Sequence, residues 1–151
     1  YNTSMQEELS KKGDLTTCPF VVITKDDKIL LGHRHYKKDE WKEISVWTIP
    51  GGRCNDGENV EEALRREVFE EIGVENLNIE KFLGEVAGVK EGDKVLIFTG
   101  TTSENPKLME PENFSEWSWL EPSNIPPDFI NEKVKELILN SVATPFPPSQ
   151  L

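Results

Sequence analysis

One segment in the middle of the chain constrains the fold most, because a sharp break is followed by a helix with marked ends. The Pro-Gly-Gly at 50–52 ends a short strand, since proline and glycine together rarely continue regular structure. Asn59 is a good N-cap, and Glu62 three residues later completes a capping-box pattern. Gly73 is a natural helix stop. A helix is therefore predicted over 60–72, and its apolar residues recur every four positions as one buried stripe: Val60, Leu64, Val68 and Ile72.

Runs of β-branched and aromatic residues on both sides of this helix predict strands. They cover residues 19–24, 28–34, 46–50, 77–89 with a break near Gly84, 95–101 and 117–120. Residues 25–27 are expected to form a hairpin turn, and the polar stretch 35–46 a loop. Helical spacing of apolar residues predicts a second helix within 129–142. Strands interleaved with two helices predict a layered α/β domain.

The length of 151 residues fits one domain with a single core. Both ends differ in composition from the middle. Residues 1–14 are polar and charged, and residues 144–151 contain three prolines. We predict a flexible N-terminal segment over 1–14, one domain over 15–143 and a flexible proline-rich tail over 144–151.

The formal net charge of −11 opposes contact with a nucleic acid polymer, because phosphates would be repelled. A small phosphorylated substrate remains compatible, since a bound divalent cation reverses the local field. No apolar run has the length of a bilayer, and the start shows no signal-peptide pattern. Cys18 and Cys54 form no CxxC pair and are predicted to be free thiols in a reducing compartment. We therefore predict a cytoplasmic protein without a membrane partner, and its oligomeric state stays open.

The polar face of the central helix is strongly acidic. Glu67, Glu70 and Glu71 share one face within its last two turns. Like charges at this spacing oppose helix formation by about 0.2–0.5 kcal/mol per pair, and the helix C-terminus disfavours anions further. A cluster that is unfavourable by itself indicates an external cation, and carboxylate oxygens suit Mg²⁺ or Mn²⁺. Taken without its surroundings, the same pattern would also fit a solvated acidic face.

The residues around these glutamates form a longer pattern. Gly52 is followed after five residues by Glu58, and after seven more by Arg66-Glu67-Val68-Phe69-Glu70-Glu71-Ile72-Gly73-Val74. This pattern resembles the Nudix box, G-x5-E-x7-R-E-U-x-E-E-x-G-U with U aliphatic, of the Nudix or MutT family. The box covers residues 52–74, and the order of strands extends the resemblance over residues 15–140. The resemblance implies an α/β/α sandwich with a mixed central sheet, and a Mg²⁺-dependent hydrolase of pyrophosphate bonds.

The resemblance also implies roles for single residues. In the family, the glutamates that match Glu67, Glu70 and Glu71 bind the metal. The arginine that matches Arg66 pairs with a box glutamate, usually the one that matches Glu58, so Glu58 is expected to be structural. We favour Glu70 as the general base that takes a proton from the attacking water, with Glu67 and Glu71 as firmer ligands.

Some family members recruit a carboxylate from a later loop, which here spans residues 109–117. Glu110 is the candidate for an additional base, and Glu112 for an additional metal ligand. Each fits a solvated loop acid equally well.

The substrate-binding residues are less strongly marked. Arg34 follows the second strand and is a candidate for a phosphate contact, although a surface cation fits as well. Gly51 and Gly52 are expected to border the substrate at the turn. Trp117 or Phe20 could stack on the base, although strand aromatics more often belong to the core.

The flanking segments resemble the MutT-like branch, whose members act on nucleoside triphosphates. An acidic loop with Glu110 and Glu112 precedes an aromatic-rich strand and a proline-terminated turn near Pro126. This favours hydrolysis of a nucleoside triphosphate to a monophosphate and pyrophosphate. Hydrolysis of a nucleotide sugar or an ADP-ribose-type diphosphate is the alternative. A non-catalytic nucleotide-binding module of the same fold is a third reading, although all four box glutamates are present.

Overall fold

A six-stranded mixed sheet forms the centre of the computed structural model, which describes residues 3–39 and 42–143. The strand order is β3-β2-β1-β5-β4, and β6 pairs with β2 outside this path. Only the β1–β5 pair is parallel among the described strand pairs. The strands are β1 (Thr17–Lys25), β2 (Lys28–Asp39), β3 (Lys42–Thr48), β4 (Asn78–Ala87), β5 (Lys94–Thr101) and β6 (Phe114–Leu120).

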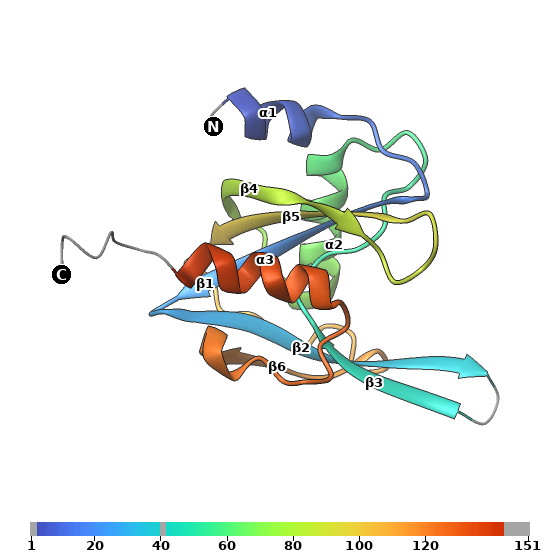
Figure 1. The fold of residues 1–151 in the computed structure, drawn as a ribbon, viewed down its shortest axis with the longest axis vertical. Coiled ribbons are helices and arrows are strands. Elements are labelled where there is room, and N and C mark those ends of the chain that lie inside the picture. The colour runs from blue at the N-terminus through green and yellow to red at the C-terminus, as the bar shows by residue number, and fades with distance from the viewer. Residues whose placement is uncertain (1–2, 40–41, 144–151) are drawn as a thin grey trace.

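Helices cover both faces of the sheet (Figure 1). Helix α2 (Val60–Ile72) packs on one face together with α1 (Thr3–Ser10), and α3 (Glu132–Ala143) packs on the other. A short 3-10 turn, η1 (Pro122–Asn124), precedes α3. This arrangement confirms the predicted α/β/α layering around a mixed sheet.

Each face of the central strands belongs to a separate apolar cluster. Val21 and Ile23 of β1 pack into the cluster that contains α2, whereas Val22 packs into the cluster that contains α3. Successive side chains of a strand point to opposite faces, so a strand buried on both sides reads as a continuous apolar run. This explains why the run at 19–24 shows no alternation with polar residues.

The central helix has the ends that its sequence predicts. Helix α2 spans Val60–Ile72, and the Asn59 side chain accepts a hydrogen bond of 2.8 Å from the backbone N–H of Glu62. The Glu62 carboxylate accepts one of 3.2 Å from the N–H of Asn59, which closes the capping box. Gly73 ends the helix with a φ of 70°, in the left-handed region that favours glycine.

Residues 35–39 and 42–46 do not form the predicted loop, and for them that prediction was wrong; residues 40 and 41 lie outside the described residues. Strand β2 continues to Asp39, and β3 runs back from Lys42 to Thr48 as its antiparallel partner. Backbone pairing, including His33 with Trp47 and His35 with Ser45, holds these polar residues in a long hairpin. Polar sequence did not exclude a strand here, because pairing satisfies the backbone whatever the side chains are.

Residues 3–10, within the segment predicted to be flexible, form helix α1. Met5 and Leu9 of this helix are 1% and 0% exposed in the core beside α2. Backbone hydrogen bonds then join the following residues to the loop before α2, from Gly13 N–H to Glu58 O and from Val60 N–H to Lys11 O. The predicted tail over 144–151 lies outside the described residues. Within the described part of the chain, no helix is long and apolar enough to cross a membrane.

Because Leu9 is fully buried, we predict that Leu9→Ala lowers the free energy of unfolding by about 2–5 kcal/mol. The exposed neighbour Glu7 provides the matched control, and Glu7→Ala should change it by less than about 0.5 kcal/mol. Urea unfolding followed by tryptophan fluorescence measures both. Equal stabilities of the two variants would show that α1 does not contribute to the core.

Candidate active site

The Gly51–Gly52 turn lies directly against the acidic face of α2. The backbone N–H of Gly51 donates a 3.0 Å hydrogen bond to Oε1 of Glu71. A Cβ atom added to Gly52 would lie only 2.6 Å from the Glu67 carboxylate carbon. Gly51 has a φ of 143°, and a Cβ there would collide with the backbone of Phe20. Glycine is therefore required at position 51 by the neighbouring backbone, and at position 52 it leaves room for the Glu67 carboxylate to lie against the turn.

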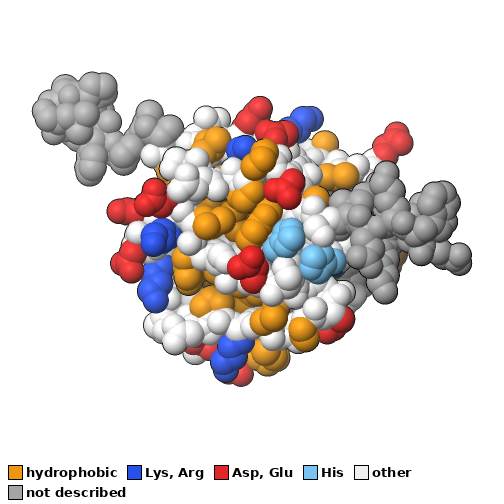
Figure 2. Space-filling view, turned by 90° about the horizontal axis from the view of Figure 1, so that it is seen from below, with side chains coloured by type: hydrophobic (Ala, Val, Ile, Leu, Met, Phe, Trp, Pro, Cys, Tyr) orange, Lys and Arg blue, Asp and Glu red, His pale blue; other side chains and the backbone are white. Residues whose placement is uncertain are grey.

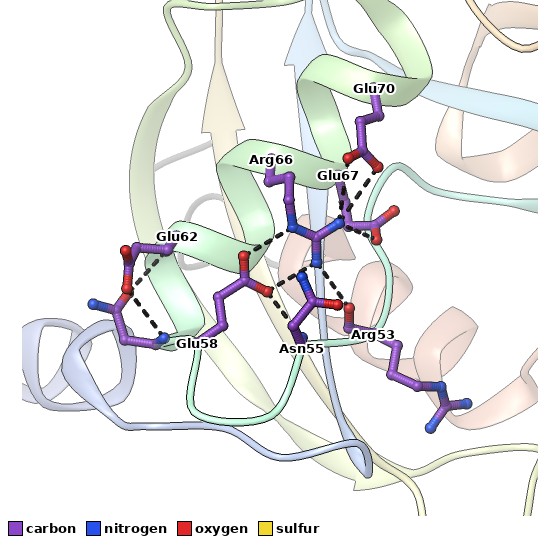
Figure 3. A network of polar contacts seen from close by, with 8 residues as sticks. Arg53, Asn55, Glu58, Glu62, Arg66, Glu67 and Glu70 are labelled. Atoms are coloured by element: carbon purple, nitrogen blue, oxygen red, sulfur yellow. Dashed lines mark hydrogen bonds and ion pairs between the residues drawn. The ribbon is translucent and has the colours of Figure 1, made fainter.

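Arg66 is the hub of the cluster (Figure 3). Its Nε and Nη2 atoms donate to the two oxygens of Glu58 at 2.8 and 2.9 Å, in a bidentate pair. Its Nη1 atom donates to Glu67 at 2.8 Å and lies 3.4 Å from Glu70. Its Nη2 atom also donates to the backbone carbonyl of Arg53 at 3.1 Å. Arg66 thus fixes the loop before α2 and orients carboxylates that lie on two turns of this helix.

Glu71 and Arg34 meet on the buried side of the cluster. Glu71 is 2% exposed, and its Oε2 atom lies 3.5 Å from Nη1 of Arg34. The Arg34 guanidinium lies over the rings of Tyr36 and Phe114, with centroid distances of 4.7 and 5.2 Å. Its Nε atom is buried without a hydrogen-bond partner among the described residues. Arg34 therefore has an unused donor beside the carboxylates.

The box glutamates differ in the direction in which their surroundings shift the pKa. Burial raises the pKa of Glu71 well above 4.5, against the opposing effects of the Gly51 N–H and Arg34. Burial also raises the pKa of Glu67, although Arg66 opposes this. Hydrogen bonding to Arg66 instead lowers the pKa of Glu58. Glu58 is thus held as an anion paired with Arg66. The negative charges of Glu67 and Glu71 are only partly balanced by neighbouring positive charge.

The loop before β6 contributes one acid to this environment. The charge of Glu110 raises the pKa of both Glu67 and Glu71, so it lies within electrostatic reach of both. Glu112 is exposed and is not among the charges that most affect either pKa. The loop is held against the end of α2, where the Met109 N–H lies 3.4 Å from the Glu71 carbonyl. The structure thus brings Glu110 to the cluster and leaves Glu112 outside it.

The donor set of the cluster fits a divalent cation. Two arginines contact four carboxylates, Arg66 those of Glu58, Glu67 and Glu70, and Arg34 that of Glu71. The excess of negative charge, with hard oxygen donors only, matches Mg²⁺ or Mn²⁺. Within residues 3–39 and 42–143, however, no three acidic, histidine or cysteine side chains converge as a ready-made metal site. Glu67 and Glu70 would therefore have to turn away from Arg66 to hold an ion.

The two histidines lie away from this cluster, on the face below β2, β3 and β6 (Figure 2). The His33 and His35 rings are 5.2 Å apart, and His33 stacks on Trp47. Their Nδ1 atoms lie within hydrogen-bond distance of the hydroxyls of Ser115 and Ser45, respectively. This surface is separate from the acidic cluster, on the opposite side of the sheet from α2.

A cavity of about 420 Å³ borders the cluster on the other side of the turn. Its floor comes from β1, β3 and β5, and its walls from the turn between β4 and β5 and the start of α3. Arg53 and Tyr36 line it on the side of the acidic cluster. The remaining lining is largely apolar and includes Phe20, Ile49, Val95, Ile97, Phe129 and Val134.

Trp117 does not lie in this cavity. Its ring covers Gly32, where an added Cβ would lie 2.7 Å from it, and packs 4.7 Å from the Phe114 ring. Trp117 is half-buried against the cluster around α2. The aromatic side chains that do line the cavity are Phe20, Tyr36 and Phe129.

Sequence reasoning missed Arg53, Asp93 and Asn131, which all line the cavity. Arg53 occupies an unspecified position of the box, and Asp93 lies between the predicted strands 77–89 and 95–101. Asn131 caps α3, because its Oδ1 accepts from the N–H groups of Lys133 and Val134 at 3.0 and 3.3 Å. An asparagine ahead of an apolar helical pattern was the signal that could have identified this cap.

An acidic helix end beside a nucleoside-sized cavity is the geometry of a phosphate-ester or anhydride hydrolase. A family model of the NUDIX domain matches residues 16–140. The chain therefore belongs to the Nudix hydrolase family.

Known relatives agree with this membership. An RNA pyrophosphohydrolase of Pelagibacter ubique is 29% identical over 147 residues, covering 78% of this chain and 89% of the relative. The nucleoside triphosphatase NudI of Escherichia coli is 29% identical over 90 residues, covering 52% of this chain and 64% of the relative. The crystal structure of a MutT NUDIX hydrolase from Burkholderia pseudomallei superimposes with a TM-score of 0.64 at 24% identity, covering 84% of this chain and 97% of that one. This last likeness shows the fold alone.

We predict that Glu71→Gln stabilises the metal-free protein at pH 8 and has little effect near pH 4.5. Burial holds the pKa of Glu71 above 4.5 in the folded state, so the folded protein binds this proton more tightly than the unfolded chain. Below pH 4.5 the carboxyl is neutral in both states, and the penalty for burying its charge is absent. As the pH rises from 4.5 to the folded pKa, the unfolded chain releases this proton while the folded protein retains it, so stability is lost, and above the folded pKa the loss is complete.

Urea unfolding in EDTA across this pH range measures the difference between the wild type and Glu71→Gln. Adding Mg²⁺ at pH 8 should raise the stability of the wild type more than that of the variant. Parallel pH profiles for the two proteins would contradict the assignment of a buried charge to Glu71.

Proposed function

We propose that this Nudix hydrolase converts a nucleoside triphosphate to a nucleoside monophosphate and pyrophosphate in the presence of Mg²⁺. The observation that carries the proposal is the position of residues 51–53. On one side this segment touches Glu67 and Glu71, and on the other it lines the apolar cavity. A triphosphate chain can thus lie at the acidic cluster while its nucleoside fills the cavity.

The roles at the phosphate end follow from burial and contacts. Glu67 and Glu71 are held close to the turn and would be the firmer ligands of the ion. Glu70 is 46% exposed and only loosely held by Arg66 at 3.4 Å, so it is free to turn towards an attacking water and accept its proton. When bound, Mg²⁺ neutralises phosphate charge and acidifies water. The unused Nε–H of Arg34 is available to a phosphate oxygen.

The nucleoside end is supported by the chemistry of the cavity. Its volume suits a nucleoside, and its lining is mostly apolar with few polar groups. Phe20, Tyr36 and Phe129 supply aromatic surface for a base. Of the two stacking candidates from the sequence, we therefore keep Phe20, add Tyr36 and Phe129, and leave out Trp117.

The named activities of the relatives favour a triphosphate substrate, since one is a nucleoside triphosphatase and another an RNA pyrophosphohydrolase. The net charge of −11 favours the small nucleotide over an RNA end. Nucleotide sugars and ADP-ribose-type diphosphates remain the alternatives within the family.

A substrate panel tests the proposal by kcat/KM with Mg²⁺. It compares normal and oxidised nucleoside triphosphates, ADP-ribose, nucleotide sugars, dinucleoside polyphosphates and a short RNA with a 5′-triphosphate. We expect triphosphates to be preferred, and Glu70→Gln to lower kcat by about 100-fold. Preference for any other substrate class would overturn the proposal, and tight nucleotide binding without turnover would indicate a binding module.

Glu110 and Glu112 form a matched pair for a second prediction, since both are acids of the same loop. Glu110→Gln should lower kcat by about tenfold, because this charge acts on Glu67 and Glu71. Glu112→Gln should change kcat by less than about twofold, since this side chain is exposed outside the cluster. Steady-state kinetics at saturating Mg²⁺ measure both, and the reverse order would place Glu112 at the metal.

A further inference from the structure

Arg53 and Asp93 form a closely fitted ion pair in the wall of the cavity. The Nη1 and Nη2 atoms of Arg53 donate to the two carboxylate oxygens of Asp93 at 2.7 and 2.6 Å. Nη1 also donates to the backbone carbonyl of Leu15. The Asp93 side chain is 8% exposed and that of Arg53 is 39% exposed, and both line the cavity. A buried carboxylate thus holds the guanidinium in one orientation.

Asp93 belongs to a tight turn at the mouth of the cavity. The N–H of Gly88 donates to the carbonyl of Asp93 at 2.9 Å, and the N–H of Asp93 donates to the carbonyl of Lys90 at 3.1 Å. A Cβ atom added to Gly88 would lie 2.7 Å from the Cβ of Asp93. These hydrogen bonds and the close approach of Gly88 therefore hold the turn between β4 and β5 at Asp93, the residue that pairs with Arg53.

Arg53 also connects this wall to the acidic cluster. Figure 3 shows its side chain pointing away from the glutamates, while its backbone carbonyl accepts the hydrogen bond from Arg66. The backbone of this residue is thus fixed from the catalytic side and its side chain from the cavity side.

The pairing decides what this guanidinium can recognise. Asp93 neutralises its charge, and hydrogen bonding between the two raises the pKa of Arg53 and lowers that of Asp93. Three of its five N–H donors are used by Asp93 and Leu15, and the ion pair balances its charge, so the group attracts a phosphate less than an unpaired arginine does. Its planar face remains, and guanidinium planes stack well on aromatic rings.

We propose that Arg53 is a specificity-determining residue whose guanidinium plane, locked by Asp93, stacks on the base of the bound nucleotide. The inference rests on the proposed function only in placing a nucleoside in the cavity. Its ligand class is a nucleoside phosphate with a planar base, in contrast to a polyphosphate without one.

Binding of the two expected products tests the proposal, since they separate base from phosphate. Dissociation constants for a purine nucleoside monophosphate and for inorganic pyrophosphate are measured by calorimetry with Mg²⁺. Arg53→Lys keeps the charge but loses the plane, and it should weaken monophosphate binding about tenfold while changing pyrophosphate binding by less than about twofold. Equal weakening of both ligands, or no change in either, would overturn the proposal.

Arg65 offers a matched control. It is 35% exposed and pairs with Glu61 at 2.9 Å and with the carbonyl of Leu77 at 2.7 Å, but it lies on α2 away from the cavity. Arg65→Lys should therefore alter stability without changing either dissociation constant. If it weakened monophosphate binding as much as Arg53→Lys does, loss of stability rather than loss of stacking would be the cause, and the proposal would fail.

Asp93→Asn provides a second variant that keeps the shape of the pair. It leaves the Arg53 charge unbalanced, so pyrophosphate binding should tighten and the preference for the monophosphate should fall. An unchanged preference for the monophosphate over pyrophosphate would contradict the proposed role of Asp93. This measurement remains informative even if Arg53→Lys does not fold.

The outcome also separates this inference from the proposed function. If the wild type binds both products but hydrolyses no triphosphate, the proposed function fails and the role of Arg53 stands. If it hydrolyses triphosphates but Arg53→Lys binds the monophosphate normally, only the role of Arg53 fails. A wild type that binds pyrophosphate but no monophosphate overturns the role of Arg53 directly.

Discussion

The buried carboxylate of Glu71 is the constraint on which the rest of the site depends. A side chain that is 2% exposed and bears a charge when ionised needs compensation, which the Gly51 N–H and Arg34 provide only in part. The turn must approach closely to supply that N–H, and glycine makes this approach possible. Glu67 adds a second negative charge nearby, so the arrangement favours a cation from outside the chain.

The acidic cluster and the cavity meet at the Gly51–Gly52 turn. Helix α2 presents the acidic cluster, while the cavity is lined partly by residues that pack with α3, such as Ile97 and Val134, and partly by Tyr36, over which Arg34 lies. The segment 51–53 crosses between them at the end of β3, where the backbone leaves the sheet. Since Arg66 holds this segment on one side and Asp93 on the other, the two halves keep a fixed relation to each other.

Local signals explain why part of this site was predictable. The capping box at Asn59 and the stop at Gly73 act within a few residues, so the bounds of α2 could be read directly. The spacing of Glu67, Glu70 and Glu71 on one helix face follows from helical geometry alone. Helix α1 gave no such signal, because only the docking of Met5 and Leu9 against α2 stabilises it. The β2–β3 hairpin depends likewise on pairing between strands.

By itself, the sequence determined the family, the acidic helix and the turn beside it, since each depends on residues that are close together in the chain. The tertiary structure decided that Glu110 joins the cluster whereas Glu112 stays outside, and that Trp117 belongs to the core rather than the cavity. It also brought Arg53 to Asp93, forty positions apart. Such pairings arise when strands align across the sheet, and no local spacing of residues encodes that alignment.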